Sequence, residues 1–174
     1  MKESSIFKRR YIVLAVLLIA LVLYFALGRS LKKAGLEGPY PCSYVIDGDT
    51  IMVSKDGREQ KVRMIGIDAP ESVHEDASKN VPEGETASAY MRELLEGKNV
   101  YLEYGQEDHD KYGRDLAYVY LEDGASMAEI LILKAGYAQL MIVSPNNEHE
   151  RELRRAQEDA KKLGLGFWGT GFYK

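Results

Sequence analysis

Four short segments of the chain carry side chains that could do chemistry. They are residues 46–50 (IDGDT), 62–64 (VRM), 67–71 (IDAPE) and 110–114 (DKYGR). Each is weak evidence alone, because Asp-Gly turns, proline-terminated strands and glycine loops are common structural features. Arg63 is the exception, since it interrupts an apolar strand, and alternation places it on the face opposite Val62 and Met64. An arginine in that position needs a partner, which is most simply a carboxylate across the sheet.

Taken together, the four segments combine carboxylates with guanidinium groups. Asp49 and Asp68 lie at neighbouring strand ends, Glu71 follows three residues later, and Arg63 and Arg114 supply the cations. Carboxylates are hard oxygen ligands that select Ca²⁺ or Mg²⁺, and no Cys/His spacing supports a zinc site. Guanidinium groups bind phosphate oxygens through two parallel hydrogen bonds. The combination indicates a site for a divalent cation and a phosphate group. The three histidines lie in polar surroundings and are expected at the surface.

Alternating hydrophobicity and Asp-Gly pairs predict the strands that must position these side chains. We expect strands over residues 44–46, 50–54, 60–67, 99–104 and 115–121. The pairs Asp47-Gly48 and Asp56-Gly57 predict hairpin turns, because glycine readily adopts positive φ.

Apolar residues at helical spacing predict three helices. The first ends near Gly97, the second opens with a capping box over residues 126–129 and closes at Gly136, and the third is capped by Asn147 and ends at Gly164. Five strands and three helices in this order favour an α+β, mainly β fold, namely a five-stranded Greek-key barrel of the OB type.

An apolar run over residues 11–27 divides the chain. We expect residues 1–10 to be a cytoplasmic flank, 11–27 a transmembrane helix, 28–38 a linker, and 39–174 a single domain facing outside. The alternative is a signal segment that is cleaved, with secretion of the domain, although the run exceeds the ~7 to 15 residues usual for such a segment. The single cysteine cannot form an internal disulfide.

Charge is distributed unevenly on the two sides of this division. Residues 1–38 hold seven Lys/Arg and two Asp/Glu, a net charge of +5, so residues 39–174 carry −9 of the chain's total of −4. The domain therefore lacks the overall electrostatic footprint of a nucleic-acid binder, and any anion site on it must be local.

The order and spacing of the four segments resemble the staphylococcal nuclease (thermonuclease) family. The resemblance runs from about Tyr44 to Trp168 and includes ETASAY at 85–90, DKYGRDLAY at 110–118 and PNN at 145–147. It implies the OB barrel with three helices, Ca²⁺ as the cofactor, and hydrolysis of DNA and RNA to 3′-phosphate products.

The resemblance also implies metal-binding and catalytic roles for individual residues. Asp49 and Asp68 would ligate Ca²⁺ through their carboxylates, and Ala69 through its backbone carbonyl. Glu71 would act as the general base on the attacking water.

Phosphate binding by the same resemblance would involve four residues of the motifs. Arg63 and Arg114 would bind the scissile phosphate, and Lys111 and Tyr112 would contact a flanking phosphate.

Two departures from the family leave an alternative function open. Met141 and Val143 stand where the reference nuclease carries tyrosines beside the base, and the domain is acidic where the reference is basic. The alternative is a catalytically silent OB-type module that binds nucleic acid or protein at the cell surface. The joint presence of the two aspartates, the glutamate and the two arginines favours the nuclease, and no protein partner is implied.

Overall fold

The computed structural model describes residues 12–24, 35–72 and 81–174. Residues Glu37–Lys174 form one compact unit, and residues 12–24 form a helix in a separate unit. In the described part of the chain, no helix is long and apolar enough to cross a membrane. The predicted flank 1–10 and parts of the predicted anchor and linker lie outside the described residues. The first strand begins at Glu37, so residues 37 and 38 of the predicted linker lie in that strand.

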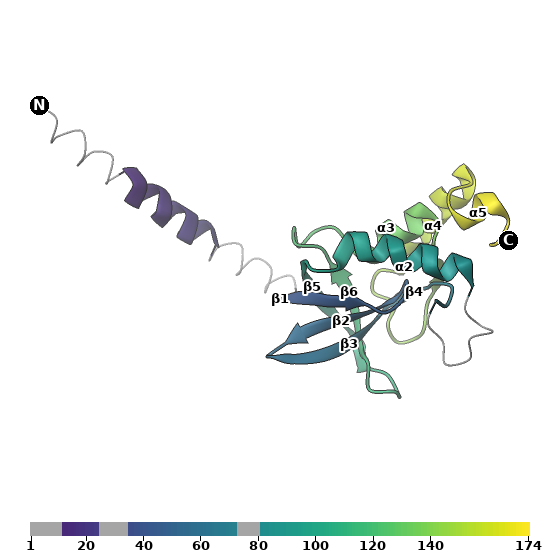
Figure 1. The fold of residues 1–174 in the computed structure, drawn as a ribbon, viewed down its shortest axis with the longest axis horizontal. Coiled ribbons are helices and arrows are strands. Elements are labelled where there is room, and N and C mark those ends of the chain that lie inside the picture. Colours follow the sequence, from purple (N-terminus) through teal and green to yellow (C-terminus); the bar gives the residue numbers. More distant parts are fainter. Residues whose placement is uncertain (1–11, 25–34, 73–80) are drawn as a thin grey trace, which may run out of the picture. The chain divides into compact units, whose positions relative to one another are not determined.

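A closed barrel of five strands forms the body of the compact unit (Figure 1). Its strands are β1 (Glu37–Val45), β2 (Thr50–Lys55), β3 (Arg58–Met64), β5 (Asn99–His109) and β6 (Asp115–Tyr120). β1 pairs with β2 and β5, β2 with β3, and β5 with β6, all antiparallel, and a parallel pairing of β3 with β6 closes the barrel. The predicted five-stranded, mainly β barrel of the OB type is therefore confirmed.

The two predicted hairpin turns have different structures. Asp56 (φ 52°) and Gly57 (φ 76°) both adopt positive φ, which is the geometry of a tight turn between β2 and β3. Gly48 does not adopt positive φ. A Cβ atom on Gly48 would lie 2.5 Å from the Cβ of Ala69 and 2.9 Å from the Cβ of Ala87. Glycine is thus required there for close packing of the loop that leads into β2.

The predicted strand 60–67 is broken at its end. Gly66 has a φ of +85°, which turns the chain out of the barrel after β3 and begins β4 (Gly66–Asp68). β4 pairs antiparallel with β7 (Gln139–Met141), so that Asp68 lies opposite Gln139 and Gly66 opposite Met141. β7 was not predicted, because three residues are too few to show alternation.

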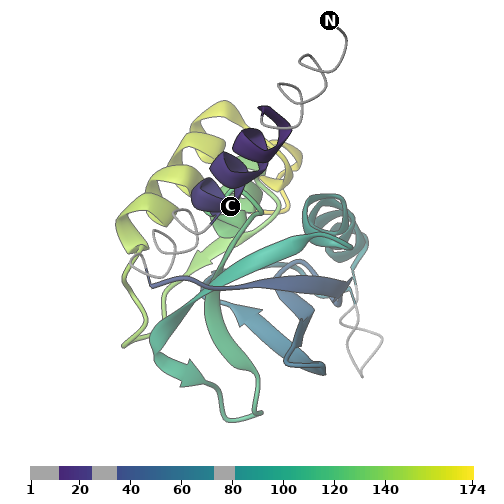
Figure 2. The ribbon, with the colours of Figure 1, turned by 90° about the vertical axis from the view of Figure 1, so that its left-hand side faces the viewer.

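The helices of this unit lie on one side of the barrel in both ribbon views (Figures 1 and 2). They are α2 (Pro82–Leu95), α3 (Ala128–Ala135), α4 (Glu150–Leu163) and the short α5 (Phe167–Thr170), which was not predicted. Met91 of α2, Leu133 of α3 and Leu153 of α4 share one hydrophobic core with Ile51 and Leu102 of the barrel. The helices and strands therefore hold one another in place.

The sequence predicts the C-terminal ends of α3 and α4 correctly, but not their N-terminal caps. Gly136 and Gly164 adopt left-handed conformations directly after α3 and α4, as predicted. The predicted caps are wrong. Ser126 Oγ donates to Asp123 Oδ2 instead of capping α3, and α4 begins at Glu150 with no side-chain cap from Asn147.

The expected surface location of the histidines is wrong in one case. His74 lies outside the described residues, and the side chain of His109 is 55% exposed. The side chain of His149 is only 24% exposed. Its Nε2 lies 2.9 Å from Glu103 Oε2, and its ring packs edge-on against Tyr118.

Candidate active site

Asp49 is a buried carboxylate at the start of β2. Its Oδ1 accepts a hydrogen bond from Thr50 Oγ1 at 3.0 Å, and its Oδ2 accepts one from the backbone N–H of Ala69 at 2.8 Å. The backbone N–H of Asp49 donates to Asp47 Oδ1 at 3.0 Å, which fixes the loop. Because Gly48 permits the close approach to Ala69, the carboxylate of Asp49 is held directly beside the end of β4.

Arg63 links this carboxylate to a second one. It lies opposite Thr50 in the pairing of β3 with β2. Its Nη1 lies 2.8 Å from Asp49 Oδ1, and its Nη2 lies 3.3 Å from Asp68 Oδ1. The Arg63 and Asp49 side chains are only 11% and 9% exposed, whereas Asp68 is 60% exposed. Arg63 was expected to have one carboxylate partner, and the structure gives it two.

Asp49 has an unusual protonation equilibrium. Its pKa is raised to about 7 overall: burial raises the pKa most, the Arg63 guanidinium lowers it, and the nearby charge of Asp47 raises it. A cation that binds the ionised form therefore competes with a proton at this carboxylate near neutral pH.

The donor set around Arg63 fits a hard divalent cation in an open site. Asp49 and Asp68 both contact the Arg63 guanidinium, through different Nη atoms, and Ala69 directly follows Asp68. Within the described ranges, no three His, Cys, Asp or Glu side chains gather as a ligand set. Ca²⁺ takes about six to eight oxygen ligands, so two carboxylates and a carbonyl leave positions for water and phosphate oxygens.

A groove of about 540 Å³ opens beside Arg63. Its polar lining includes Arg63, Lys111, Tyr112 and Arg114 from the motifs, together with the acidic residues Glu107, Asp108 and Asp110. Its apolar lining includes Leu116, Met141 and Val143. In the pairing of β4 with β7, Met141 lies opposite Gly66, two residues before Asp68, so this apolar wall lies on the strand beside β4. Asp49 and Asp68 themselves do not line the groove.

Arg114 is held within the β5–β6 loop. Its Nε donates to Asp110 Oδ2 at 2.7 Å, and the backbone N–H groups of Arg114 and Tyr112 donate to Asp110 Oδ1. Burial acts to raise the pKa of Asp110, but these hydrogen bonds outweigh it and lower the pKa overall. The ring centroid of Tyr112 lies 5.0 Å from Lys111 Nζ and 5.7 Å from Arg114 Cζ. Arg114 thus lines the same groove as Arg63 but pairs with a different aspartate.

Glu71 is exposed, and its contacts are made by its backbone rather than by its carboxylate. Its carbonyl oxygen accepts a hydrogen bond from the N–H of Val81 at 3.0 Å, and it packs against Gly84 of α2, where a Cβ would collide with it. Among the residues that the structure describes, the Glu71 carboxylate has no hydrogen-bond or ion-pair partner. The structure therefore places Glu71 near α2 without joining its side chain to the cluster of Asp49, Arg63 and Asp68.

Asn146 is a positioning residue that sequence reasoning missed. It is buried, its Oδ1 accepts from the N–H of Glu107 at 2.9 Å, and its Nδ2 donates to the carbonyl of Glu107 at 2.9 Å. A Cβ on Gly105 would lie 2.5 Å from the Asn146 side chain. Asn146 thus fixes the strand that leads into the loop carrying Lys111. The PNN motif contained this residue, but no local pattern indicates a partner 39 positions away.

Comparison with known proteins places these residues in a family. The model of the family described as staphylococcal nuclease homologue matches residues 61–170. The chain is 37% identical over 163 residues to a thermonuclease of Staphylococcus hyicus, which covers 91% of this chain and 95% of that protein. A thermonuclease of Staphylococcus intermedius is 36% identical over 161 residues, covering 90% and 94% of the two chains.

Another relative matches a smaller share of this chain. Endonuclease YncB of Bacillus subtilis (strain 168) is 39% identical over 130 residues, which is 74% of this chain and 60% of that protein. The aligned length is comparable to the compact unit of Glu37–Lys174.

Proposed function

The chain belongs to the staphylococcal nuclease family and is a nuclease, and we propose that it hydrolyses phosphodiester bonds of DNA or RNA with Ca²⁺ as its cofactor. The observation that carries this proposal is the single guanidinium of Arg63 in contact with both Asp49 and Asp68 at the edge of a groove with further cationic groups. Thermonuclease and endonuclease are also the names of the relatives described above.

The carboxylates of Asp49 and Asp68 and the carbonyl of Ala69 would hold the metal ion. When bound, Ca²⁺ supplies charge neutralisation and orients the phosphate and the attacking water. The partial exposure of Asp68 leaves this side of the site open to a phosphate oxygen. The buried Asp49 supplies the fixed end of the site, because its hydrogen bonds to Thr50 and Ala69 hold its carboxylate in one orientation.

The arginines are proposed to bind the scissile phosphate. Both line the groove, and guanidinium donors are most effective where negative charge develops in the transition state. Asp110 occupies only the Nε of Arg114, so the Nη donors of that residue remain to reach a phosphate oxygen. Lys111 and Tyr112, on the same loop, would contact the neighbouring phosphate.

Glu71 is proposed as the general base. It would take a proton from water, the water oxygen would bond to phosphorus, and the P–O5′ bond would break. The departing O5′ would take a proton from solvent, which leaves 3′-phosphate and 5′-hydroxyl ends. The packing of the Glu71 carbonyl against Gly84 supports this role, because it anchors the backbone from which the carboxylate must reach the site.

Substrate binding by this site is expected to be weak and governed by one phosphate. Leu116, Met141 and Val143 give the groove an apolar wall without an aromatic ring on that side. Stacking on an aromatic ring contributes about 1 to 3 kcal/mol per base, and that contribution is absent from this wall. The acidic domain also provides little long-range attraction, so we expect a shallow dependence of binding on salt.

We propose further that the apolar run 11–27 tethers the protein to the cell membrane with the nuclease domain outside. Support comes from the uniformly apolar helix of residues 12–24 and from the excess of Lys/Arg before the run. Secretion after cleavage of the run is the alternative. Membrane fractionation and protease treatment of intact cells test this: a domain that is protected while an N-terminal tag is digested would reverse the orientation.

A cleavage assay with the full chain tests the nuclease proposal. Plasmid DNA and RNA are incubated with protein in Ca²⁺ or in an excess of chelator, and the product ends are labelled with and without prior phosphatase treatment. We expect cleavage only in Ca²⁺. The 3′ ends of the products should be labelled only after phosphatase treatment. Binding of nucleic acid without any cleavage would instead support the silent binding module.

A further inference from the structure

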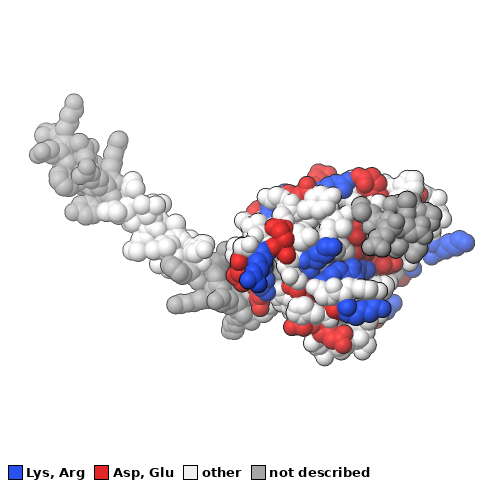
Figure 3. Space-filling model, turned by 60° about the horizontal axis from the view of Figure 1, so that its bottom comes forward, with Lys and Arg blue, Asp and Glu red and all other residues white. Residues whose placement is uncertain are grey.

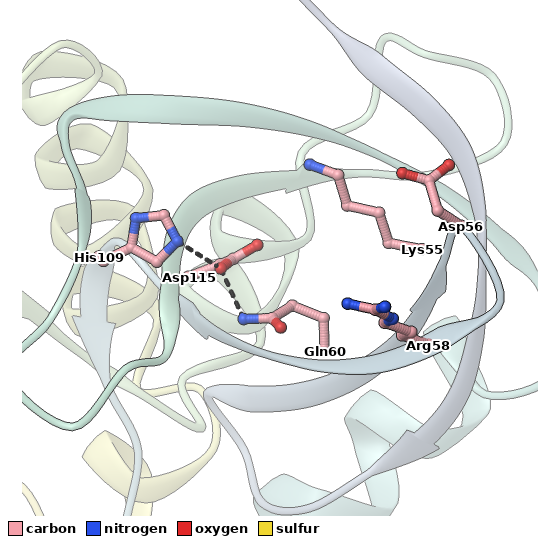
Figure 4. A pocket seen from close by; sticks show the side chains of 6 residues that line it. All are labelled: Lys55, Asp56, Arg58, Gln60, His109 and Asp115. Carbon is pink, nitrogen blue, oxygen red and sulfur yellow. Dashed lines mark hydrogen bonds and ion pairs between the residues drawn. The ribbon is translucent and has the colours of Figure 1, made fainter.

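A second polar pocket lies at the end of the barrel beside the proposed active site (Figure 4). It has a volume of about 430 Å³ and lies between the β2–β3 hairpin and the ends of β5 and β6 that flank their loop. Its lining consists of Lys55, Asp56, Arg58, Gln60, His109 and Asp115. Asp115 belongs to the DKYGRDLAY motif, whereas the other five residues lie outside the motifs that indicated the nuclease site.

Asp115 forms the buried floor of this pocket, and both of its carboxylate oxygens have partners. Its Oδ1 accepts from Gln60 Nε2 at 2.6 Å and lies 3.1 Å from His109 Nε2. Its Oδ2 accepts from the hydroxyl of Tyr104 at 3.0 Å. The Asp115 side chain is 6% exposed, so this carboxylate holds the pocket together and offers little negative surface to a ligand.

The two cations of the pocket differ in how their charges are paired. Lys55 Nζ is shared between Glu37 at 3.1 Å and Tyr104 at 3.0 Å. Arg58 is exposed and, among the residues that the structure describes, has no ion pair or side-chain hydrogen bond. In Figure 4 its guanidinium points toward Gln60 and the pocket, whereas the carboxylate of Asp56 points away. An unpaired guanidinium aimed into a polar pocket matches an anion with several oxygens.

His109 connects this pocket to the proposed active site. Its side chain lines both the 430 Å³ pocket and the 540 Å³ groove that contains Arg63. A hydrogen bond from His109 to Asp108 raises the pKa of the imidazole, which favours the protonated form on this boundary. Figure 3 shows Lys and Arg side chains near the middle of the lower face of the molecule, in a domain whose net charge is −9. The lining of the pocket itself combines two cations, Lys55 and Arg58, with two carboxylates, Asp56 and Asp115.

We propose that the pocket formed by Arg58, Lys55 and His109 is a second phosphate-binding subsite, which takes a phosphate of the nucleic-acid strand where the strand leaves the catalytic groove. The identification of a strand phosphate rests on the proposed nuclease function. A free phosphate group has the same chemistry and is the other source of the ligand. Arg58 provides the guanidinium, Lys55 a second positive charge, and His109 the boundary with the groove.

Arg58→Ala tests the subsite, with Lys61→Ala as the matched control. Both residues are exposed on β3, but Lys61 lines neither cavity, so the two variants remove the same charge from the same strand. Arg58 has no ion pair to lose, and circular dichroism checks that both variants fold. The first arm measures binding of a fluorescent single-stranded oligonucleotide of about ten nucleotides to the full chain in chelator, at several salt concentrations. The second arm follows the Arg58 and His109 side-chain NMR signals of the wild-type protein during titration with inorganic phosphate.

The expected result is a loss of oligonucleotide affinity of about three- to tenfold in Arg58→Ala, with a salt slope reduced by about one phosphate contact, and little change in Lys61→Ala. Saturable shifts of the Arg58 and His109 signals by phosphate, without an effect of Arg58→Ala on the oligonucleotide, would also support a phosphate site but assign it to free phosphate. Equal effects of both variants on the oligonucleotide, with no phosphate-induced shifts, would overturn the proposal. A failure of the nuclease function itself would appear as a lack of cleavage by the wild type, which the phosphate titration does not require.

Discussion

Arg63 Nη1 lies 2.8 Å from Asp49 Oδ1 in a pair whose two side chains are almost fully buried. The same guanidinium reaches Asp68 Oδ1 at 3.3 Å, so one cation holds together two carboxylates that would otherwise repel each other. This relationship connects the phosphate-binding and metal-binding roles that we propose. A substitution at Arg63 should therefore affect both.

Arg63→Lys should lower kcat/KM by at least about 10², because an ammonium group cannot contact two carboxylates and a phosphate as the planar guanidinium can. Cleavage of a defined oligonucleotide measures this effect. Arg92→Lys on α2 is the control, since Arg92 pairs with Glu85 and lines no part of the groove. Equal activity of Arg63→Lys and the wild type would remove Arg63 from the site.

Gly48→Ala should destabilise the fold by about 1 to 3 kcal/mol and also weaken Ca²⁺ binding, because the new methyl group collides with Ala69 and Ala87 and displaces Asp49. Urea unfolding and calorimetric titration with Ca²⁺ measure the two effects. In Gly57→Ala, the new side chain meets no atom within 4 Å but adopts an unfavourable positive φ. That control should lose stability while its Ca²⁺ affinity is unchanged, and a parallel loss of affinity there would contradict the role of Gly48 packing.

Gly84→Ala should reduce activity by roughly tenfold or more, because the added methyl group pushes away the backbone of Glu71, and small displacements of reacting groups are costly. Alanine in a helix is otherwise favoured over glycine by about 1 kcal/mol. Measurement of kcat together with thermal unfolding distinguishes the effect of the collision with Glu71 from the effect of helix propensity. A more stable protein with full activity would show that the position of Glu71 does not matter for catalysis.

Much of the barrel followed from local signals, because alternation and paired Asp-Gly residues act over a few positions. β7 and α5 are too short to show a periodic pattern of apolar residues. The positive φ of Gly66 turns the chain after β3, and nothing in the neighbouring sequence indicates that turn. The capping residue predicted at Ser126 instead bonds to Asp123, since turn and helix cap compete for the same hydroxyl.

The candidate site shows the same division between local and long-range information. Motif spacing pointed to Asp49, Arg63 and Asp68, which the structure brings into contact. It could not indicate the clamp of Asn146 on Glu107 or the bond between Gln60 and Asp115, because these partners lie 39 and 55 positions apart.

The buried Glu129 should make stability depend on pH. Burial raises its pKa well above 4.5, although its Oε1 accepts a hydrogen bond from the N–H of Val119. The folded state therefore keeps a proton that the unfolded state releases above pH 4.5, so the free energy of unfolding should fall as pH rises above that value, by at most about 1.4 kcal/mol per unit.

Glu129→Gln cannot titrate and should lack this decline. Urea unfolding at pH 5 to 8 should therefore show the variant gaining on the wild type as pH rises. Glu122→Gln, at an exposed position, is the control and should keep the wild-type pH profile. Identical pH profiles for wild type and Glu129→Gln would show that Glu129 ionises normally in the folded protein.

The dependence of cleavage rate on free Ca²⁺, compared between the wild type and Asp68→Asn, tests the central claim most directly. Asp68 is 60% exposed, so the substitution should leave the fold intact while it removes one proposed metal ligand. Loss of a ligand should raise the Ca²⁺ concentration for half-maximal rate at least about tenfold. Wild-type cleavage that persists in chelator, or an identical Ca²⁺ dependence in Asp68→Asn, would contradict a calcium site at Asp49 and Asp68.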